Sequence, residues 1–266
     1  METKTLSKPA LNVIDQYLNF KFGSAISSIP YFNNKTTRTR AALRTHIGKG
    51  SPKDIREELE TLIVKNHLDQ NTLTNESLKK ILVDNNLGIE CSGFAYQVLN
   101  TESEERGRGA LNKHLSFVNC KGLLAKIRCS LRPIENCDVA TFADDSNSHT
   151  VSLNEITAGD IITMTSSEMN NESAERNHIL VVHEVLTVLP TNGQMTNNII
   201  KISYTHSVAY PEDGIYGTGV KQGYIEISDV NKPITEARWV EGNKEGLSNI
   251  LFIRAKKSKT EVRRLK

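Results

Sequence analysis

The order of the hydrophobic patterns along the chain is the feature that most constrains its fold. Apolar residues recur at helical spacing in the first part of the 266-residue chain, and short β-type runs follow from about residue 160 onward. The run Ile179–Val185 is largely apolar on both faces, which is typical of a central strand. Helices followed by strands predict an α+β fold, in which N-terminal helices pack against a central antiparallel sheet.

Capping residues sharpen the helix predictions. Apolar spacing predicts a first helix between Leu11 and Phe22, ended by the pair that begins with Gly23. Ser51, followed by Pro52 and an acid three residues on, is a typical start for a second helix. A third helix is predicted to start at Thr74 or Asn75. Beyond the central run, strands are predicted over residues 160–164, 199–204, 224–227 and 250–253.

The chain shows neither a long linker nor an internal repeat, so we expect one domain with a helical extension. Residues 1–87 are predicted to be a helical extension or insertion, and residues 88–255 the catalytic core. Residues 101–148, which are polar and irregular, are expected to form helix fragments and loops. The basic residues 256–266 are expected to form a solvated tail.

Charge and hydropathy exclude several functional classes. Lys and Arg number 33 and Asp and Glu 31, so the net charge of +2 gives no global field for nucleic acid. No apolar stretch approaches the roughly 18 residues of a membrane helix, so we expect no membrane span. The first residues lack an apolar signal core, which predicts a cytoplasmic protein or export by a non-classical route. The oligomeric state is left open.

The four cysteines divide into one candidate nucleophile and three others. None lies in a CxxC pair, so no zinc site is predicted. Cys91 begins a short predicted helix, where the helix dipole and free N–H groups favour a thiolate and can bind an oxyanion. Ser92 and Gly93 are small, which lets another backbone segment approach the helix start. Three cysteines are expected to be structural, without a clear disulfide: Cys120, Cys129 and Cys137.

Two histidines lie where a base and its orienting partner are needed. His178 begins the central strand and His206 ends the next one. If these strands are antiparallel neighbours, both imidazoles meet at one edge of the sheet, and the Cys91 helix packed across it completes a triad. His183 is the alternative base. It lies an odd number of residues after His178, so the two point to opposite faces of a regular strand.

The segments that carry these residues resemble the motifs of NlpC/P60 cysteine peptidases. The resemblance covers about residues 88–207, in the same order and at similar spacing. Four segments resemble the family's D-C-S-G-F/L, P-G-D-L-V, H-V-G-I-Y and I-H-A motifs in turn: Glu90-Cys91-Ser92-Gly93-Phe94, Ala158-Gly159-Asp160-Ile161-Ile162, Asn177-His178-Ile179-Leu180-Val181-Val182 and Tyr204-Thr205-His206-Ser207.

The resemblance implies a papain-like α+β core with Cys91 as nucleophile, His178 as base and His206 as the orienting residue. It also implies that Ser92 and Gly93 help to form the substrate site. The chain departs from the family in having Glu90 in place of an aspartate. A further family segment, P-Y-x-x-G-G, has its nearest counterpart at Tyr31, separated from Cys91 by two predicted helices. If Tyr31 lines the site, those helices are an insertion.

The resulting hypothesis is a thiol hydrolase that cleaves an amide bond in peptidoglycan stem peptides, between γ-D-glutamate and a diamino acid. The chemistry needs neither a metal ion nor an organic cofactor. Arg38, Arg40 and Arg44 are either a solvated helix face or a basic wall for substrate carboxylates. Two alternatives remain open. One is a papain-like amidase, deamidase or acyltransferase acting on a protein or lipid, and the other is an inactive binding domain.

Overall fold

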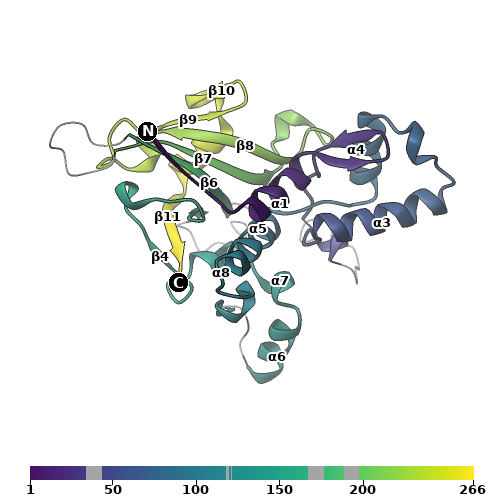
Figure 1. Ribbon diagram of the computed structural model, residues 1–266, viewed down its shortest axis with the longest axis horizontal. Helices are drawn as coiled ribbons and strands as arrows, with labels where there is room; N and C mark the ends of the chain where they lie inside the picture. The colour runs from purple at the N-terminus through teal and green to yellow at the C-terminus, as the bar shows by residue number, and fades with distance from the viewer. Residues whose placement is uncertain (34–43, 118–119, 121, 167–176, 189–197) are drawn as a thin grey trace.

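A large antiparallel sheet lies at the centre of the molecule and is covered by apolar cores on both faces (Figure 1). The computed structural model describes residues 1–33, 44–117, 120, 122–166, 177–188 and 198–266. Within these residues, every pairing in the sheet is antiparallel. The predicted α+β class, with helices against a central antiparallel sheet, is therefore confirmed.

Most helices precede residue 144 and most strands follow residue 147. The helices are α1 (Lys8–Leu18), α3 (Pro52–Lys65), α4 (Asn75–Asp84), α5 (Cys91–Glu105), α6 (Leu123–Leu131), α7 (Pro133–Asn136), α8 (Val139–Ala143) and α9 (Ile250–Lys257). The strands are β1 (Glu2–Thr5), β2 (Phe20–Phe22), β3 (Ala25–Ser27), β4 (Ser148–Thr150), β5 (Ile161–Thr165), β6 (His178–Val188), β7 (Asn198–Val208), β8 (Gly219–Glu226), β9 (Arg238–Glu241), β10 (Lys244–Glu245) and β11 (Lys259–Leu265).

The long strand β6 organises the main sheet, whose strands follow the order β10-β9-β8-β7-β6-β5-β11-β4. On one side, β6 pairs with β7. On the other side, its first half pairs with β5 and its second half with the N-terminal strand β1. Ile179 and Val181 enter the core under α5, whereas Leu180 and Val182 enter the core under α9. The prediction of a central strand that is apolar on both faces is confirmed.

The helices with clear capping signals form as predicted. Ser51 accepts a hydrogen bond from the backbone N–H of Asp54, whose carboxylate accepts one from the N–H of Ser51, so both ends of a capping box are present. Thr74 caps α4 by accepting from the N–H of Ser77. Each helix buries an apolar stripe, for example Ile55 and Leu59 in α3. The local sequence therefore determines these starts without help from distant contacts.

The first helix is shorter than predicted. It ends at Leu18, and residues 20–22 form a strand that pairs with β3 in a two-stranded hairpin. Gly23 takes a positive φ of 58° at the turn, and a Cβ there would lie 2.0 Å from the carbonyl oxygen of Gln70. Phe20 and Phe22 are buried by this hairpin. Gly23 therefore forms the turn of this hairpin and does not end the helix.

Residues 250–253, predicted as a strand, begin the helix α9. Asn249 caps the helix by accepting hydrogen bonds from the N–H groups of Leu251 and Phe252. Leu251 and Ala255, one turn apart, are fully buried against the sheet. The capping residue and the i, i+4 spacing outweigh the β-type composition of the apolar run.

The predicted basic tail is a strand inside the sheet. β11 lies between β5 and β4, and Val262 is buried opposite Ile162. Arg263 is only 2% exposed because Asp145 and Glu261 pair with its guanidinium and Ser148 accepts a hydrogen bond from it. Compensated charge, which the local sequence does not reveal, allows this basic segment to be buried.

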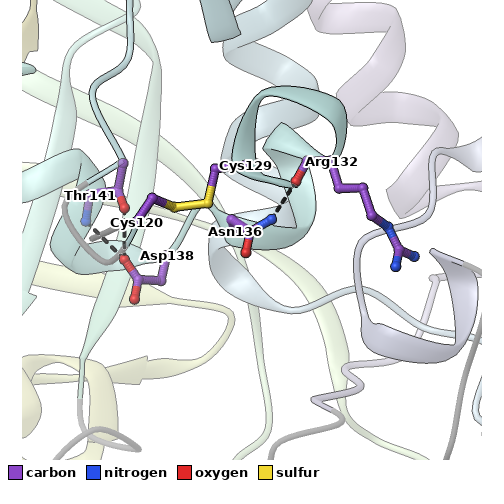
Figure 2. The surroundings of a disulfide bond; sticks show 6 residues. All are labelled: Cys120, Cys129, Arg132, Asn136, Asp138 and Thr141. Atoms are coloured by element: carbon purple, nitrogen blue, oxygen red, sulfur yellow. Dashed lines mark hydrogen bonds between the residues drawn. A yellow bond between two sulfur atoms is a disulfide. The ribbon is translucent and has the colours of Figure 1, made fainter. Parts of the chain in front are cut away.

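Two of the three cysteines expected to be structural are joined to each other. Cys120 and Cys129 form a disulfide (Figure 2). Cys91 and Cys137 are free and buried. Cys120 precedes α6 and Cys129 lies within it, so the bond, which the irregular cysteine spacing did not indicate, closes a short loop around the start of α6.

None of the helices described is both long enough and apolar enough to cross a bilayer. The helix face predicted around Arg38 and Arg40 lies outside the described residues. Arg44 is described, and its Nε lies 3.7 Å from Oε1 of Glu135.

The burial of β11 predicts that Val262→Asp lowers the free energy of unfolding by at least about 3 kcal/mol, because it places an unpaired charge in the core. Chemical denaturation followed by circular dichroism measures this change. Lys257→Asp, at the exposed end of α9, is the control and should cost less than about 1 kcal/mol. Equal stability of both variants would show that β11 is not part of the sheet.

Candidate active site

The N-terminus of α5 meets the sheet at the place where β6 and β7 separate. The paired positions of these strands end at Val181 and Thr205. Beyond that point Ser207 Oγ of β7 donates to the carbonyl of Ile89 at 2.6 Å, and the backbone of Ile179 on β6 acts on Cys91 to lower the pKa of its thiol. The start of α5 is thus hydrogen-bonded to β7, and α5 also packs against β6.

Cys91 is the first residue of α5, as predicted. Glu90 has an extended backbone and provides no side-chain cap, so the first N–H groups of the helix are not taken by the preceding side chain. Gly93 allows the segment before α3 to approach, since a Cβ there would lie 2.5 Å from the carbonyl oxygen of Gly48. The close approach expected for this glycine is present, and it brings Lys49 next to the helix start.

A buried ion pair supports the helix start from below. Lys49 Nζ lies 2.5 Å from Glu90 Oε1 and donates to Ser92 Oγ and to the carbonyl of Cys137. Ser92 Oγ also lies 2.6 Å from Glu90 Oε1. The buried charges are therefore compensated by each other and by further hydrogen bonds. This cluster fixes the position of the residue just before the nucleophile candidate.

The two histidines come together at the open end of β6 and β7. His178 Nε2 lies 2.6 Å from His206 Nδ1, and His206 Nε2 lies 2.7 Å from Glu241 Oε2 on β9. Both imidazoles are buried, with His206 fully enclosed. Tyr204 lies beside this series of hydrogen bonds, and its hydroxyl is 3.5 Å from Glu241 Oε2. Side chains from β6, β7 and β9 thus form one continuous chain of hydrogen bonds.

The order of these contacts determines which nitrogens carry protons. Burial alone would raise the pKa of Glu241, but the interaction with His206 and the Lys221 charge together lower it. Glu241 is therefore a carboxylate and accepts from His206 Nε2–H. With Nδ1 of His206 unprotonated, that nitrogen accepts from His178 Nε2–H. This leaves the lone pair of His178 on Nδ1, the nitrogen that a general base requires.

Cys91 and His178 both rest in their neutral forms, and a direct contact between their side chains is not among the described interactions. Burial, and next the charge of Glu90, raises the pKa of Cys91 to about 11, although Lys49 and the N–H of Ile179 act in the opposite direction. Burial, and next the charge of Arg254, lowers the pKa of His178 well below its ordinary value. The helix dipole expected to favour a thiolate is thus outweighed by desolvation in the unliganded site.

Tyr31 lies beside the cysteine. Its backbone forms a parallel bridge with Ile89, two residues before Cys91, and burial raises the pKa of its hydroxyl. The chain therefore leaves the site after Tyr31, forms α3 and α4, and returns at Ile89. The charge of Arg254 on α9 also acts on Tyr31, Cys91 and His178, and Arg254 has no ion pair within the described part of the chain.

The remaining predicted site residues are placed as follows. Ser92 and Gly93 are buried beneath the helix start, and their part in substrate binding stays a prediction. His183 contacts Thr205 Oγ1 at 3.0 Å and makes no contact with His206 among the described interactions. Since the imidazole chain includes His178 alone of the two, the geometry favours His178 as the base candidate.

Three residues of this region were not found by sequence reasoning. Glu241 lies two residues after Trp239 on the same face of β9, and only the strand order brings it to His206. Lys49 stands between two glycines in a segment read as a turn. Arg254 directly follows residues 250–253, which were predicted as a strand. Glu241 and Lys49 each have a partner far away in the sequence, so no local signal marks them.

The region described contains no group of three or more His, Cys, Asp or Glu side chains arranged to hold a metal ion. A scan against protein-family models, a search of curated proteins and a search of solved structures each found no match to this chain.

The buried Lys49–Glu90 pair predicts a strong dependence of stability on charge balance. Lys49→Met should lower the free energy of unfolding by about 3–5 kcal/mol, because it leaves Glu90 buried without its counter-charge. Lys49→Met combined with Glu90→Gln should recover most of that loss. Urea denaturation of the three proteins measures it. Additive losses in the double variant would contradict the pairing.

Proposed function

We propose that the chain is a thiol hydrolase of the NlpC/P60 type with a papain-like arrangement, in which Cys91 is the nucleophile. The observation that carries the proposal is the chain from Glu241 through His206 to His178, on the strands β6 and β7 against which the Cys91 helix α5 packs. A buried glutamate at one end of two hydrogen-bonded imidazoles determines which ring nitrogens carry protons. A general base needs an unprotonated nitrogen, so this arrangement suits a base.

In the first half of the proposed reaction, His178 Nδ1 takes the proton of the Cys91 thiol as the sulfur attacks the carbonyl carbon of an amide. Backbone N–H groups at the start of α5 stabilise the oxyanion. The imidazolium then donates this proton to the leaving nitrogen, the C–N bond breaks, and an amine departs. His206 and Glu241 stabilise the positive charge on His178 while it lasts.

In the second half, water attacks the thioester and gives one proton to His178. The C–S bond breaks, the acid product leaves, and the proton returns to the sulfur. The neutral resting pair means that proton transfer accompanies attack on the substrate. Proton transfer and bond formation are therefore linked, and a bound amide provides the driving force.

Arg254 supports a substrate that carries a carboxylate near the scissile bond. Its guanidinium acts electrostatically on both Cys91 and His178 and has no ion-pair partner among the described residues. The α-carboxylate of a γ-linked D-glutamate in a peptidoglycan stem peptide has this chemistry. The Cys120–Cys129 disulfide also fits action in an oxidising compartment, outside the cytosol, where peptidoglycan lies.

We propose hydrolysis of muropeptides that contain the bond between γ-D-glutamate and a diamino acid. The wild type should release the free diamino-acid product, whereas Cys91→Ala should release none, because the acyl-enzyme cannot form. Mass spectrometry of the products measures this. Cys137→Ala, which removes the other free thiol, is the control and should retain cleavage.

The pH dependence follows from the lowered pKa of His178. The base works when neutral, so kcat/KM should stay level as the pH falls through 6.5, the ordinary histidine value, and decline only at lower pH. Muropeptide cleavage by Cys91→Ala at the wild-type rate would overturn the assignment. Acyl transfer to an added amine without hydrolysis would support the transferase alternative instead.

Glu241→Gln tests the tautomer argument. A glutamine can donate to His206 Nε2, which moves the proton of His206 to Nδ1 and that of His178 to Nδ1 as well, so the base is lost. We expect kcat to fall by at least about 100-fold. Nitrogen NMR of labelled histidines should show the proton on His178 moving from Nε2 to Nδ1.

The matched control is Glu226→Gln, which removes a surface carboxylate paired with Arg238 on the neighbouring strand. It should leave both kcat and the histidine tautomers unchanged. An equal loss of activity in both variants, or an unchanged tautomer in Glu241→Gln, would limit Glu241 to a structural role.

A further inference from the structure

The helix α6 lies at the side of the molecule opposite the outer strands β9 and β10, beyond α7 (Figure 1). Four large aliphatic side chains on this short helix face solvent, with Leu123, Leu124 and Leu131 each more than 70% exposed and Ile127 half exposed. At about 100° per residue, these positions fall within one arc of the helix. They form a continuous apolar face, which we term the α6 face.

The outward direction of this face is fixed by the bonds on the other side of α6. Cys129, one turn after the partly buried Ala125, is 1% exposed and joined to Cys120 (Figure 2). The carbonyl of Arg132, just after the helix, accepts a hydrogen bond from Asn136 of α7. These two bonds join α6 to Cys120 and to α7 on the side away from the four aliphatic residues, which face solvent.

The surrounding sequence is strongly basic although the whole chain is nearly neutral. From Arg106 to Ile134 there is no Asp or Glu, and the stretch contains seven Lys and Arg residues against a net charge of +2 for the chain: Arg106, Arg108, Lys113, Lys121, Lys126, Arg128 and Arg132. Two of the seven are paired with acids just outside the stretch, Arg106 with Glu102 and Arg132 with Glu135. Helical periodicity places the backbone positions of Lys126 and Arg128 on the two sides of the α6 face.

We propose that the α6 face inserts into the interface of a membrane that contains anionic lipids. The apolar arc would enter the boundary between headgroups and acyl chains, while the flanking basic positions meet the anionic headgroups. The disulfide holds the helix in the inserting geometry before contact, so less ordering is required on binding. The positive charge of the segment around α6 is complementary to the negative charge of the lipid surface.

The composition of the face favours lipid over a protein partner. Binding hot spots between proteins are enriched in Trp, Tyr and Arg that fill pockets. The α6 face is aliphatic and projects outward, and hydrocarbon accepts such side chains without directional contacts. This proposal is separate from the hydrolase proposal, because none of its residues belongs to the candidate active site. Cys91→Ala should therefore bind vesicles as the wild type does.

The test uses the oxidised full-length protein with phosphatidylcholine vesicles, either pure or with roughly one-third phosphatidylglycerol. Sedimentation should show at least about tenfold stronger partitioning to the anionic vesicles, weakened by high salt. Leu123→Glu combined with Leu124→Glu should reduce that partitioning by at least about tenfold, because two apolar contacts are replaced by charges repelled by the lipid.

The matched control is Val64→Glu combined with Leu247→Glu, which replaces two equally exposed apolar side chains elsewhere and should bind as the wild type does. Thermal melting confirms that both double variants fold. In a separate variant, Leu124→Trp should show blue-shifted emission on anionic vesicles. Unchanged binding of the α6 double variant would overturn the proposal. The proposal would also be overturned if the wild type did not bind anionic vesicles but formed a dimer that the α6 substitutions dissociate.

Discussion

The antiparallel pairing of β6 with β7, and the place where it stops, determines both the sheet and the candidate site. Along most of its length the pairing satisfies the backbone of two buried strands. Past Val181 and Thr205 this pairing ends, and α5 packs against the two strands there, with Ser207 Oγ donating to the carbonyl of Ile89 just before the helix. A buried polar group needs a partner, so the strand opening and the helix start require each other.

Two buried acids hold this arrangement, and each has a different partner. Glu90 is neutralised by Lys49, and the pair positions the residue before the thiol. Glu241 is hydrogen-bonded to His206, and through it to His178, so it acts on protons as well as on position. A carboxylate at either place costs desolvation free energy, which is recovered only with the partner present. The region therefore tolerates little independent change in its charged residues.

The sequence predicted those parts of the fold that depend on local interactions. The capping box at Ser51, the apolar run after His178 and the cysteine at a helix start all reflect contacts within a few residues. Prediction failed where a distant partner decides. β11 is buried because Asp145, more than a hundred residues away, pairs with Arg263. Glu241 reaches the histidines only through strand order. The roles given to Cys91, His178 and His206 remain predictions, although the structure brings the two imidazoles into contact.

The neutral resting state of Cys91 and His178 follows from the same burial that makes the site specific. Removing water raises the free energy of every charged form, so neither a thiolate nor an imidazolium is favoured before substrate binds. The chain of Glu241 and His206 does not reverse this preference. It stabilises an imidazolium once one forms, and it points the free nitrogen of His178 away from His206. Reactivity would then depend on a bound amide, which supplies both the electrophile and the group that finally takes the proton. A thiol in such a site is protected from adventitious oxidation while it remains protonated.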